Sequence, residues 1–229
     1  MRTLYSLSLT LMLFGCQNDS APEQAPQADN QTTKTADSKS APPEVASSKS
    51  CTYEIKSAKP EWTAYKFTNK APVGGTFNSY TLSETQSATA LTKAFDGLSI
   101  EIDASSVESN NPQRNTTITE QYFAKFAPQH TLKANVVSSK GDNTKGTMNI
   151  NIEMNGVSKT LPFSYTYEST KGVLEAKSVM DMMDFNLKGP FDSIHEACKT
   201  LHTGPDGVAK TWTEVALQVT AEVIETCTQ

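Results

Sequence analysis

The chain has 229 residues, of which 37% are hydrophobic and 8% aromatic, so it can bury one core of moderate size and also carry tails. Its 20 lysine and arginine residues against 25 aspartate and glutamate residues give a formal net charge of −5. This balance lacks the basic surface of a nucleic-acid-binding protein, and no nucleic-acid partner is predicted. No stretch of about 18 apolar residues occurs, which excludes a protein with several membrane-spanning helices.

The first residues have the pattern of a bacterial secretion signal. Arg2 precedes an apolar run over residues 4–14, which is too short to span a bilayer and has the length of a signal core. The run ends in Gly15-Cys16, which resembles the lipobox of bacterial lipoproteins. We therefore predict a signal peptide over residues 1–15 and an acylated Cys16 that anchors the protein to a membrane. The alternative is an ordinary signal peptide cut nearby, with Cys16 a spare thiol.

The predicted anchor places the protein in the bacterial cell envelope. Gln17 follows Cys16, and by resemblance to sorted lipoproteins the absence of Asp there favours the outer membrane, on its periplasmic face or its surface. Four prolines follow among small and polar residues, without one aromatic residue up to position 50. Such a composition cannot bury enough apolar surface to fold. Residues 16–50 are therefore predicted to be the lipidated cysteine and a disordered linker, and residues 51–229 the folded domain.

The folded part has the alternation of antiparallel strands. Apolar residues recur at every second position over residues 98–102, 148–154, 161–167 and 215–223. Asn155-Gly156 separates two of these runs and is a favoured pair for a tight hairpin turn. Helical spacing occurs only over residues 194–201 and, less clearly, 91–95. These patterns predict an all-β sandwich or barrel with one or two short helices.

Several short motifs resemble the YceI family, in the same order along the chain. Residues 62–67 (WTAYKF) and 73–77 (VGGTF) are similar to the opening strands of that family, and residues 98–107 (LSIEIDASSV) to a later strand. The arginine motif that follows is Arg114-Asn115 here, where the family has an aspartate in the second position. The remaining similar segments are Tyr122-Phe123, residues 154–159 (MNGVSK), Asp184-Phe185 and residues 210–215 (KTWTEV).

The resemblance covers about residues 51–227 and implies an eight-stranded antiparallel, lipocalin-like barrel with a long apolar channel. Members of the family are periplasmic or secreted, and some hold polyisoprenoids, isoprenoid quinones or other long-chain amphiphiles. A barrel of eight strands can either pack its interior with side chains or hold one small ligand. The resemblance favours the hollow barrel over the packed core.

Flexible methionines and flat aromatic rings on the apolar faces suit an irregular apolar ligand. Each buried CH₂ group of a ligand contributes about 0.8 kcal/mol, so a long tail needs few polar contacts. The predicted lining residues are Ile100, Phe123, Phe126, Ile150, Ile152, Phe163, Tyr165, Met180, Met182 and Phe185.

The predicted function is therefore that of an envelope lipoprotein that binds or carries a polyisoprenoid, an isoprenoid quinone or a fatty amphiphile. It is not predicted to be an enzyme, since no HExxH or GxSxG motif is present. Two alternatives remain, a structural or adhesive module with a packed core, and an envelope enzyme acting on a lipidic substrate or quinone. Titratable groups clustered at one barrel mouth would favour the enzyme, and the sequence indicates no such cluster. No cofactor is predicted, and the pattern names no protein partner.

The spacing of His195, Cys198 and His202 allows a metal site, because the three share one face if this segment is helical. No further ligand can be identified, and packing or capping roles are favoured, so no metal site is predicted. With Cys16 acylated, at most one disulfide can form among Cys51, Cys198 and Cys227. The first and last strands of a closed barrel are antiparallel neighbours, which favours Cys51–Cys227 over Cys51–Cys198 and Cys198–Cys227.

Overall fold

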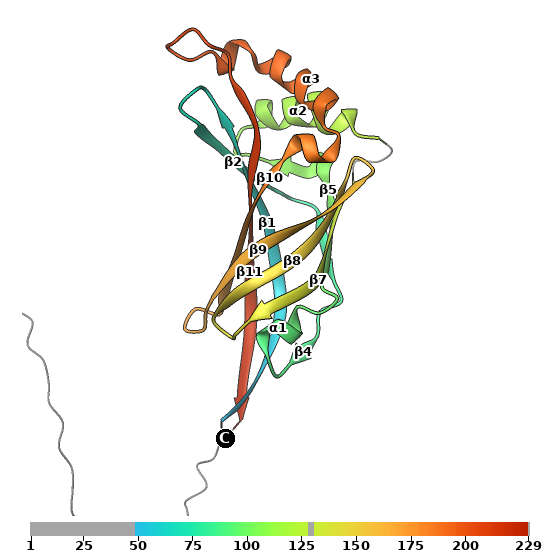
Figure 1. Ribbon diagram of the computed structural model, residues 1–229, viewed down its shortest axis with the longest axis vertical. Coiled ribbons are helices and arrows are strands. Elements are labelled where there is room, and N and C mark those ends of the chain that lie inside the picture. The colour runs from blue at the N-terminus through green and yellow to red at the C-terminus, as the bar shows by residue number, and fades with distance from the viewer. Residues whose placement is uncertain (1–48, 128–130, 229) are drawn as a thin grey trace, which may run out of the picture. The chain divides into compact units, whose positions relative to one another are not determined.

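The computed structural model describes residues 49–127 and 131–228. The predicted signal peptide, Cys16 and almost all of the predicted linker lie outside these residues. The described chain is an antiparallel sheet that curls on itself, with a few short helices at its two ends (Figure 1). The strands are β1 (Ser50–Lys66), β2 (Ala71–Phe77), β3 (Tyr80–Ser83), β4 (Ser87–Ala88), β5 (Ser99–Asp103), β6 (Val107–Glu108), β7 (Thr131–Gly141), β8 (Lys145–Met154), β9 (Val157–Glu168), β10 (Val173–Asp181) and β11 (Thr211–Thr228).

The hydrogen-bonded order is β3-β5-β7-β8-β9-β10-β11-β1-β2-β6, and β4 pairs separately with β1. Strand β2 leads directly into β3, and β5 leads into β6 through one short 3₁₀ turn, η1 (Ala104–Ser106). At this bend the backbone N–H of Asn78 donates to the carbonyl of Ser106 (2.9 Å), and that of Asp103 to the carbonyl of Ser79 (3.0 Å). These two bent segments therefore stay paired throughout, and eight effective strands surround the interior. This confirms the predicted all-β, lipocalin-like architecture.

Alternation along the strands fills the interior with apolar side chains. On β8, Met148, Ile150, Ile152 and Met154 are buried, while the residues between them are more exposed. The β8–β9 hairpin turns at Asn155 (φ 50°) and Gly156 (φ 73°), which is the pair of positive angles that a type I′ turn requires. The predicted pairing of these two runs is thus present in the sheet.

The helices gather at opposite ends of the barrel (Figure 1). The short helix α1 (Leu91–Ala94) lies at one end, and α2 (Pro112–Gln121) and α3 (Lys188–Cys198) lie together at the other. The remaining 3₁₀ turns are η2 (Phe123–Lys125), η3 (Met182–Phe185) and η4 (Thr200–His202). Within the described ranges, no helix has both the length and the apolar character needed to cross a membrane.

Helix α2 was not predicted from the sequence. Its start is nevertheless encoded locally, because Asn111 caps the helix by accepting a hydrogen bond from the backbone N–H of Arg114 (2.9 Å). Pro112 occupies the first turn, where its missing N–H costs nothing. The sequence Asn111-Pro112 was the available signal. Helix α3 and turn η4 together cover most of the predicted helical segment 194–201 and begin six residues earlier.

Candidate ligand-binding cavity

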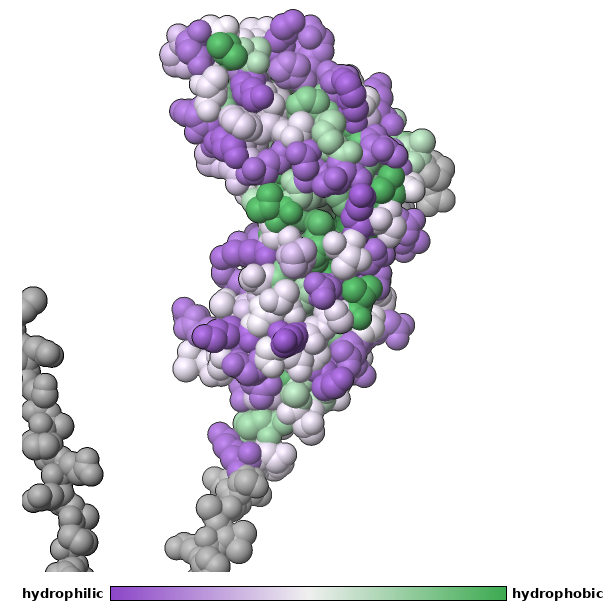
Figure 2. Space-filling model, in the orientation of Figure 1, coloured by the Kyte–Doolittle hydropathy of each residue, from purple (hydrophilic) through white to green (hydrophobic). Residues whose placement is uncertain are grey.

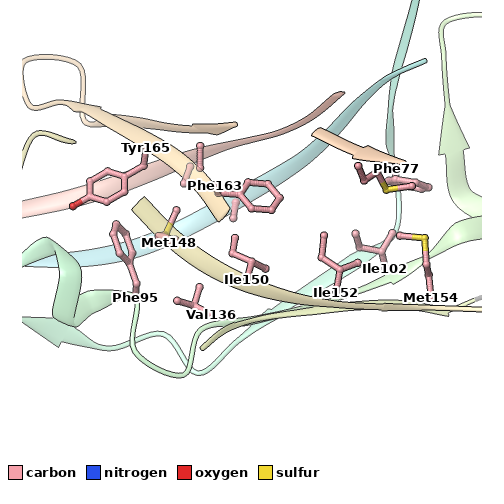
Figure 3. Close-up of a cluster of buried hydrophobic side chains, with 14 of the residues drawn as sticks. Phe77, Phe95, Ile102, Val136, Met148, Ile150, Ile152, Met154, Phe163 and Tyr165 are labelled. Carbon is pink, nitrogen blue, oxygen red and sulfur yellow. The ribbon is translucent and has the colours of Figure 1, made fainter. Parts of the chain in front are cut away.

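The barrel interior contains a cavity of about 300 Å³. This volume lies at the lower end of the range of about 300–1,000 Å³ that is typical of small-molecule sites. Side chains of the cavity wall lie close together in the interior, as Figure 3 shows for Phe163 of β9 beside Ile150 of the neighbouring strand β8 and for Ile102 near Met154. Almost the entire wall consists of aliphatic, methionine and aromatic side chains contributed by both the sheet and α2.

Eight of the ten predicted lining residues reach this cavity. They are Ile100, Phe123, Phe126, Ile150, Ile152, Phe163, Met180 and Met182.

Tyr165 and Phe185 are buried but do not line the cavity. Tyr165 lies beyond the end of the cavity, where its ring meets Phe95 edge-on at 5.2 Å between centroids and its hydroxyl donates to the carbonyl of Asp142 (2.7 Å). Phe185 is fully buried in the 3₁₀ turn η3, which follows β10. Period-two spacing does not extend to Phe185, because the strand β10 ends at Asp181 and a 3₁₀ turn follows.

The end of the cavity near α1 is closed by aromatic packing. Phe95 and Leu91 are fully buried there, and Phe95 packs against Tyr165. The backbone N–H of Leu91 donates to the side-chain oxygen of Asn143 (2.8 Å), which fixes α1 against the β7–β8 turn. We call this the α1 end of the cavity.

The opposite end is polar. Lys66, Arg114, Cys198, His202 and Thr211 line it, from β1, α2, α3, η4 and β11 respectively. We call this the α3 end. The sequence pointed to no cluster of titratable groups at a barrel mouth, because these residues lie up to 145 positions apart and only the curled sheet brings them together.

Two histidines converge on one hydroxyl at the α3 end. The Nδ1 atoms of His195 and His202 lie 3.0 Å and 2.8 Å from Oγ1 of Thr211. The hydroxyl has one hydrogen and can accept two more, so it can donate to one ring while accepting from the N–H of the other. The two imidazoles are therefore bridged by Thr211.

The pKa values of two groups at the α3 end are shifted in the direction that favours the neutral form of each group. Burial lowers the pKa of the His202 imidazole, and the nearby positive charge of Lys66 and then His195 lower it further. Burial raises the pKa of the Cys198 thiol, and Lys66 opposes part of this shift. Cys198 is half-buried and has no disulfide partner. A thiol with a raised pKa is a poor nucleophile at neutral pH.

The disulfide of the structure joins Cys51 on β1 to Cys227 on β11, which are direct partners in the antiparallel register. These two cysteines and Glu225 are also the one group of His, Cys, Asp or Glu side chains in residues 49–127 and 131–228 close enough to share an ion. Because both thiols are consumed by the disulfide, this group has no thiolate to offer a metal. His195, Cys198 and His202 do not form such a group.

On the face drawn in Figure 2, hydrophilic residues cover most of the surface, and hydrophobic residues gather at a narrowing below α2 and α3. The lining residues that were not predicted as site residues include Trp62, Lys66 and Arg114. Trp62 and Lys66 lie four positions apart on β1, so the period of two that located other inward residues also placed them on one face. Their polar atoms made them poor candidates for an apolar channel.

Comparisons with known proteins agree on the fold. The family model described as the YceI-like domain matches residues 52–223. A polyisoprenoid-binding domain from Saccharophagus degradans, implicated in plant cell wall breakdown, is similar over 75% of this chain and 98% of its own, with a TM-score of 0.51 and 13% identity. BcnA from Burkholderia cenocepacia is similar over 73% of this chain and 96% of its own, also with a TM-score of 0.51 and 13% identity. No curated protein sequence matches the chain.

Proposed function

This chain belongs to the YceI-like family, and from that premise we propose that it binds an amphiphile with a long apolar tail inside its barrel. The ligand class is a polyisoprenoid, an isoprenoid quinone or a fatty amphiphile. The similar domain from Saccharophagus degradans is described as polyisoprenoid-binding, which supports this class.

The observation that carries the proposal is the apolar cavity of about 300 Å³ between the barrel walls. Protein interiors are normally packed to the density of organic crystals, with few voids larger than a water molecule. A structural or adhesive module with a packed core would therefore leave no such space. An empty apolar cavity is costly, whereas each CH₂ group of a tail that enters it contributes about 0.8 kcal/mol.

We propose binding or carriage rather than catalysis. The pair of histidines on Thr211 is the arrangement that most favours the enzyme alternative, because it places bases beside a hydroxyl at the end of the cavity. No carboxylate is hydrogen-bonded to either ring in residues 49–127 and 131–228 to orient it as a base. The one free thiol of that part of the chain is held in its protonated form by burial.

We further propose that the protein is anchored through acylated Cys16 in the bacterial cell envelope, at the outer membrane. The lipobox-like Gly15-Cys16 after an apolar run supports this. Replacing Cys16 with serine should move the protein from the membrane fraction to the soluble fraction and abolish labelling by palmitate. Unchanged membrane retention and labelling in Cys16→Ser would contradict the anchor.

Native mass spectrometry of the full chain, produced by a bacterium that exports it, tests the binding function. The expected result is a bound species of discrete mass, which organic extraction releases chemically intact and identifies as a prenyl or fatty compound. A ligand-free protein that also fails to take up geranylgeraniol or palmitate would contradict the proposal. Conversion of the added lipid to a product would favour the enzyme alternative.

A further inference from the structure

We propose that the α3 end of the cavity is a head-group subsite for an anion, so that the preferred ligand carries a phosphate or carboxylate on its apolar tail. The proposal deepens the binding function and rests on it. Within residues 49–127 and 131–228, the cavity wall carries two cations without an ion pair and one buried donor without an acceptor.

Four formally charged side chains line the cavity, and two of them are already paired. Glu61 forms an ion pair with Lys59 (2.9 Å), and Lys133 forms one with Glu101 (3.4 Å). The side chains of both pairs are partly or largely exposed to solvent. They therefore contribute no unmet charge to the interior.

The other two, Lys66 and Arg114, are cations with no ion pair in residues 49–127 and 131–228. The ammonium of Lys66 lies over the ring of Phe67 at 4.8 Å from its centroid, and its charge reaches both Cys198 and His202. The residue after Arg114 is the neutral Asn115, whose side-chain oxygen is occupied by the N–H and hydroxyl of Ser109 (2.9 Å and 2.6 Å). Asn115 therefore offers neither a charge nor a free side-chain oxygen to Arg114.

A third donor belongs to Trp62, which also lines the cavity. The indole Nε1 of Trp62 is buried and is the one buried side-chain nitrogen or oxygen in the described residues that has no hydrogen-bond partner. The indole can only donate, and a buried donor that is left unpaired loses its hydrogen bonds to water without gaining one in the protein, which is destabilising. Buried orphans of this kind indicate a missing partner, such as a ligand atom.

The geometry of β1 orders these donors along the cavity. Trp62 and Lys66 lie on the same face of the strand, four residues and thus about 13 Å apart, with Lys66 nearer the α3 end. Lys66 and Arg114 are therefore assigned to the anion itself. Trp62 lies deeper and is assigned to an oxygen where the head group joins the tail, which then extends toward Phe95 at the α1 end.

Within residues 49–127 and 131–228, the side chains of Lys66, Arg114 and Trp62 can only donate hydrogen bonds and have no carboxylate partner, so a ligand with acceptor atoms would satisfy them. A neutral hydrocarbon would leave the charges of Lys66 and Arg114 uncompensated. A primary amine would be repelled by them. Phosphate and carboxylate both provide charged acceptors for lysine and arginine. The neutral form of His202, favoured by burial, leaves room for one further hydrogen bond from or to the ligand.

The test uses three probes with one C20 tail: geranylgeranyl phosphate, geranylgeranoic acid and geranylgeraniol. The full chain is incubated with an equimolar mixture, separated from free lipid by gel filtration, and the bound lipids are extracted and quantified. The expected result is enrichment of one or both anions over the alcohol by roughly tenfold or more. Enrichment of the phosphate alone or of both anions identifies which oxyanion the subsite accepts.

The test variant combines Lys66→Gln and Arg114→Gln. The control variant is Lys177→Gln, which removes an exposed, paired lysine from the outer face of β10. The double variant should lose the anion enrichment while it still binds geranylgeraniol, and the control should keep it. Trp62→Phe keeps the ring but removes the donor, and it should reduce the enrichment less than the double variant does. Circular dichroism verifies that each variant folds.

Two results would overturn the inference, and they are distinguishable. If the wild-type chain binds all three lipids equally and the double variant does the same, the head-group subsite is absent while the tail-binding function stands. If none of the three lipids binds, the binding function itself fails, and the subsite fails with it.

Discussion

The indole ring of Trp62 on β1 lies over Gly75 on β2, in the space that any side chain at position 75 would fill. A Cβ atom on Gly75 would lie 2.5 Å from Cζ2 of Trp62 and 2.6 Å from the carbonyl oxygen of Glu108. The two residues are direct partners in the β1–β2 register. The glycine is therefore required by the close approach of the ring and of the β6 backbone.

Gly75→Ala should destabilise the protein by about 1–3 kcal/mol, as overpacking does elsewhere, because neither Trp62 nor the β6 backbone can move away freely. The free energy of unfolding in urea measures this, and tryptophan fluorescence reports the displaced ring. Gly189→Ala in α3 is the control, because no atom lies within 4 Å of its added Cβ and the helix favours alanine. Equal stability of the two variants would show that the Trp62–Gly75 contact is looser than described.

Phe163→Asp should abolish uptake of geranylgeraniol, because it places a carboxylate in the apolar wall of the cavity. Ser164→Asp puts the same charge on the exposed face of β9 and should leave uptake unchanged. Lipid recovered after gel filtration gives the result for both. Since Phe163→Asp also risks unfolding, Ile150→Phe provides a second variant that fills the cavity with an apolar ring and should reduce uptake. Full uptake by folded Phe163→Asp would remove this residue from the binding wall.

Replacing both Cys51 and Cys227 with alanine should lower the free energy of unfolding by several kcal/mol. Their disulfide closes a loop of sequence separation 176, for which the chain-entropy estimate is about 5 kcal/mol and measured values are typically about 2–4 kcal/mol. Reduction by dithiothreitol should destabilise the wild type equally and leave the double variant unaffected. Cys198→Ala is the control, with a change of about 1 kcal/mol or less. A double variant as stable as the wild type would contradict a contribution of the disulfide to stability.

Stability should fall as the pH drops below the ordinary histidine pKa of about 6.5. Burial lowers the pKa of His202, with Lys66 and His195 adding to the shift, so the unfolded chain binds a proton at that position before the folded chain does. The contribution of neutral His202 to the free energy of unfolding is thus complete above about pH 6.5. It is lost as the pH falls toward the pKa of His202 in the folded protein. Unfolding free energies at pH 7.5 and 5.5 measure the loss, which should be smaller in His202→Gln. An identical pH dependence in both proteins would exclude His202 as its source.

The strands and their inward faces could be predicted because their chemistry is local. Met148, Ile150 and Ile152 alternate with polar residues along β8, and Asn155-Gly156 specifies the hairpin that follows. The cavity wall on these strands is therefore encoded in the period of two. Tyr165 follows the same period but lies beyond the cavity. The length of the cavity along the barrel is set by α1 and Phe95, which packs against Tyr165, and not by the sequence of β9.

The polar end of the cavity could not be predicted in this way. Lys66, Arg114 and Thr211 meet only through the closure of the barrel and the docking of α2 and α3. His195 and His202, seven positions apart, were expected on one helical face, and the chain instead enters η4 before His202. Their convergence on Thr211 depends on a residue from β11, and no spacing within the helix indicates that partner.

The position of the disulfide also determines how the folded unit responds to tension. Strands β1 and β11 are antiparallel, and Ser50–Thr228 is the one described pair that lies outside Cys51–Cys227. A force that pulls the two ends of this unit apart would separate neighbouring strands one pair at a time, which is the weakest direction for a β-ladder. Here such a force meets a covalent bond after a single pair. While the cysteines remain oxidised, the disulfide prevents β1 and β11 from separating under this force. After reduction, the same two strands can separate one residue pair after another.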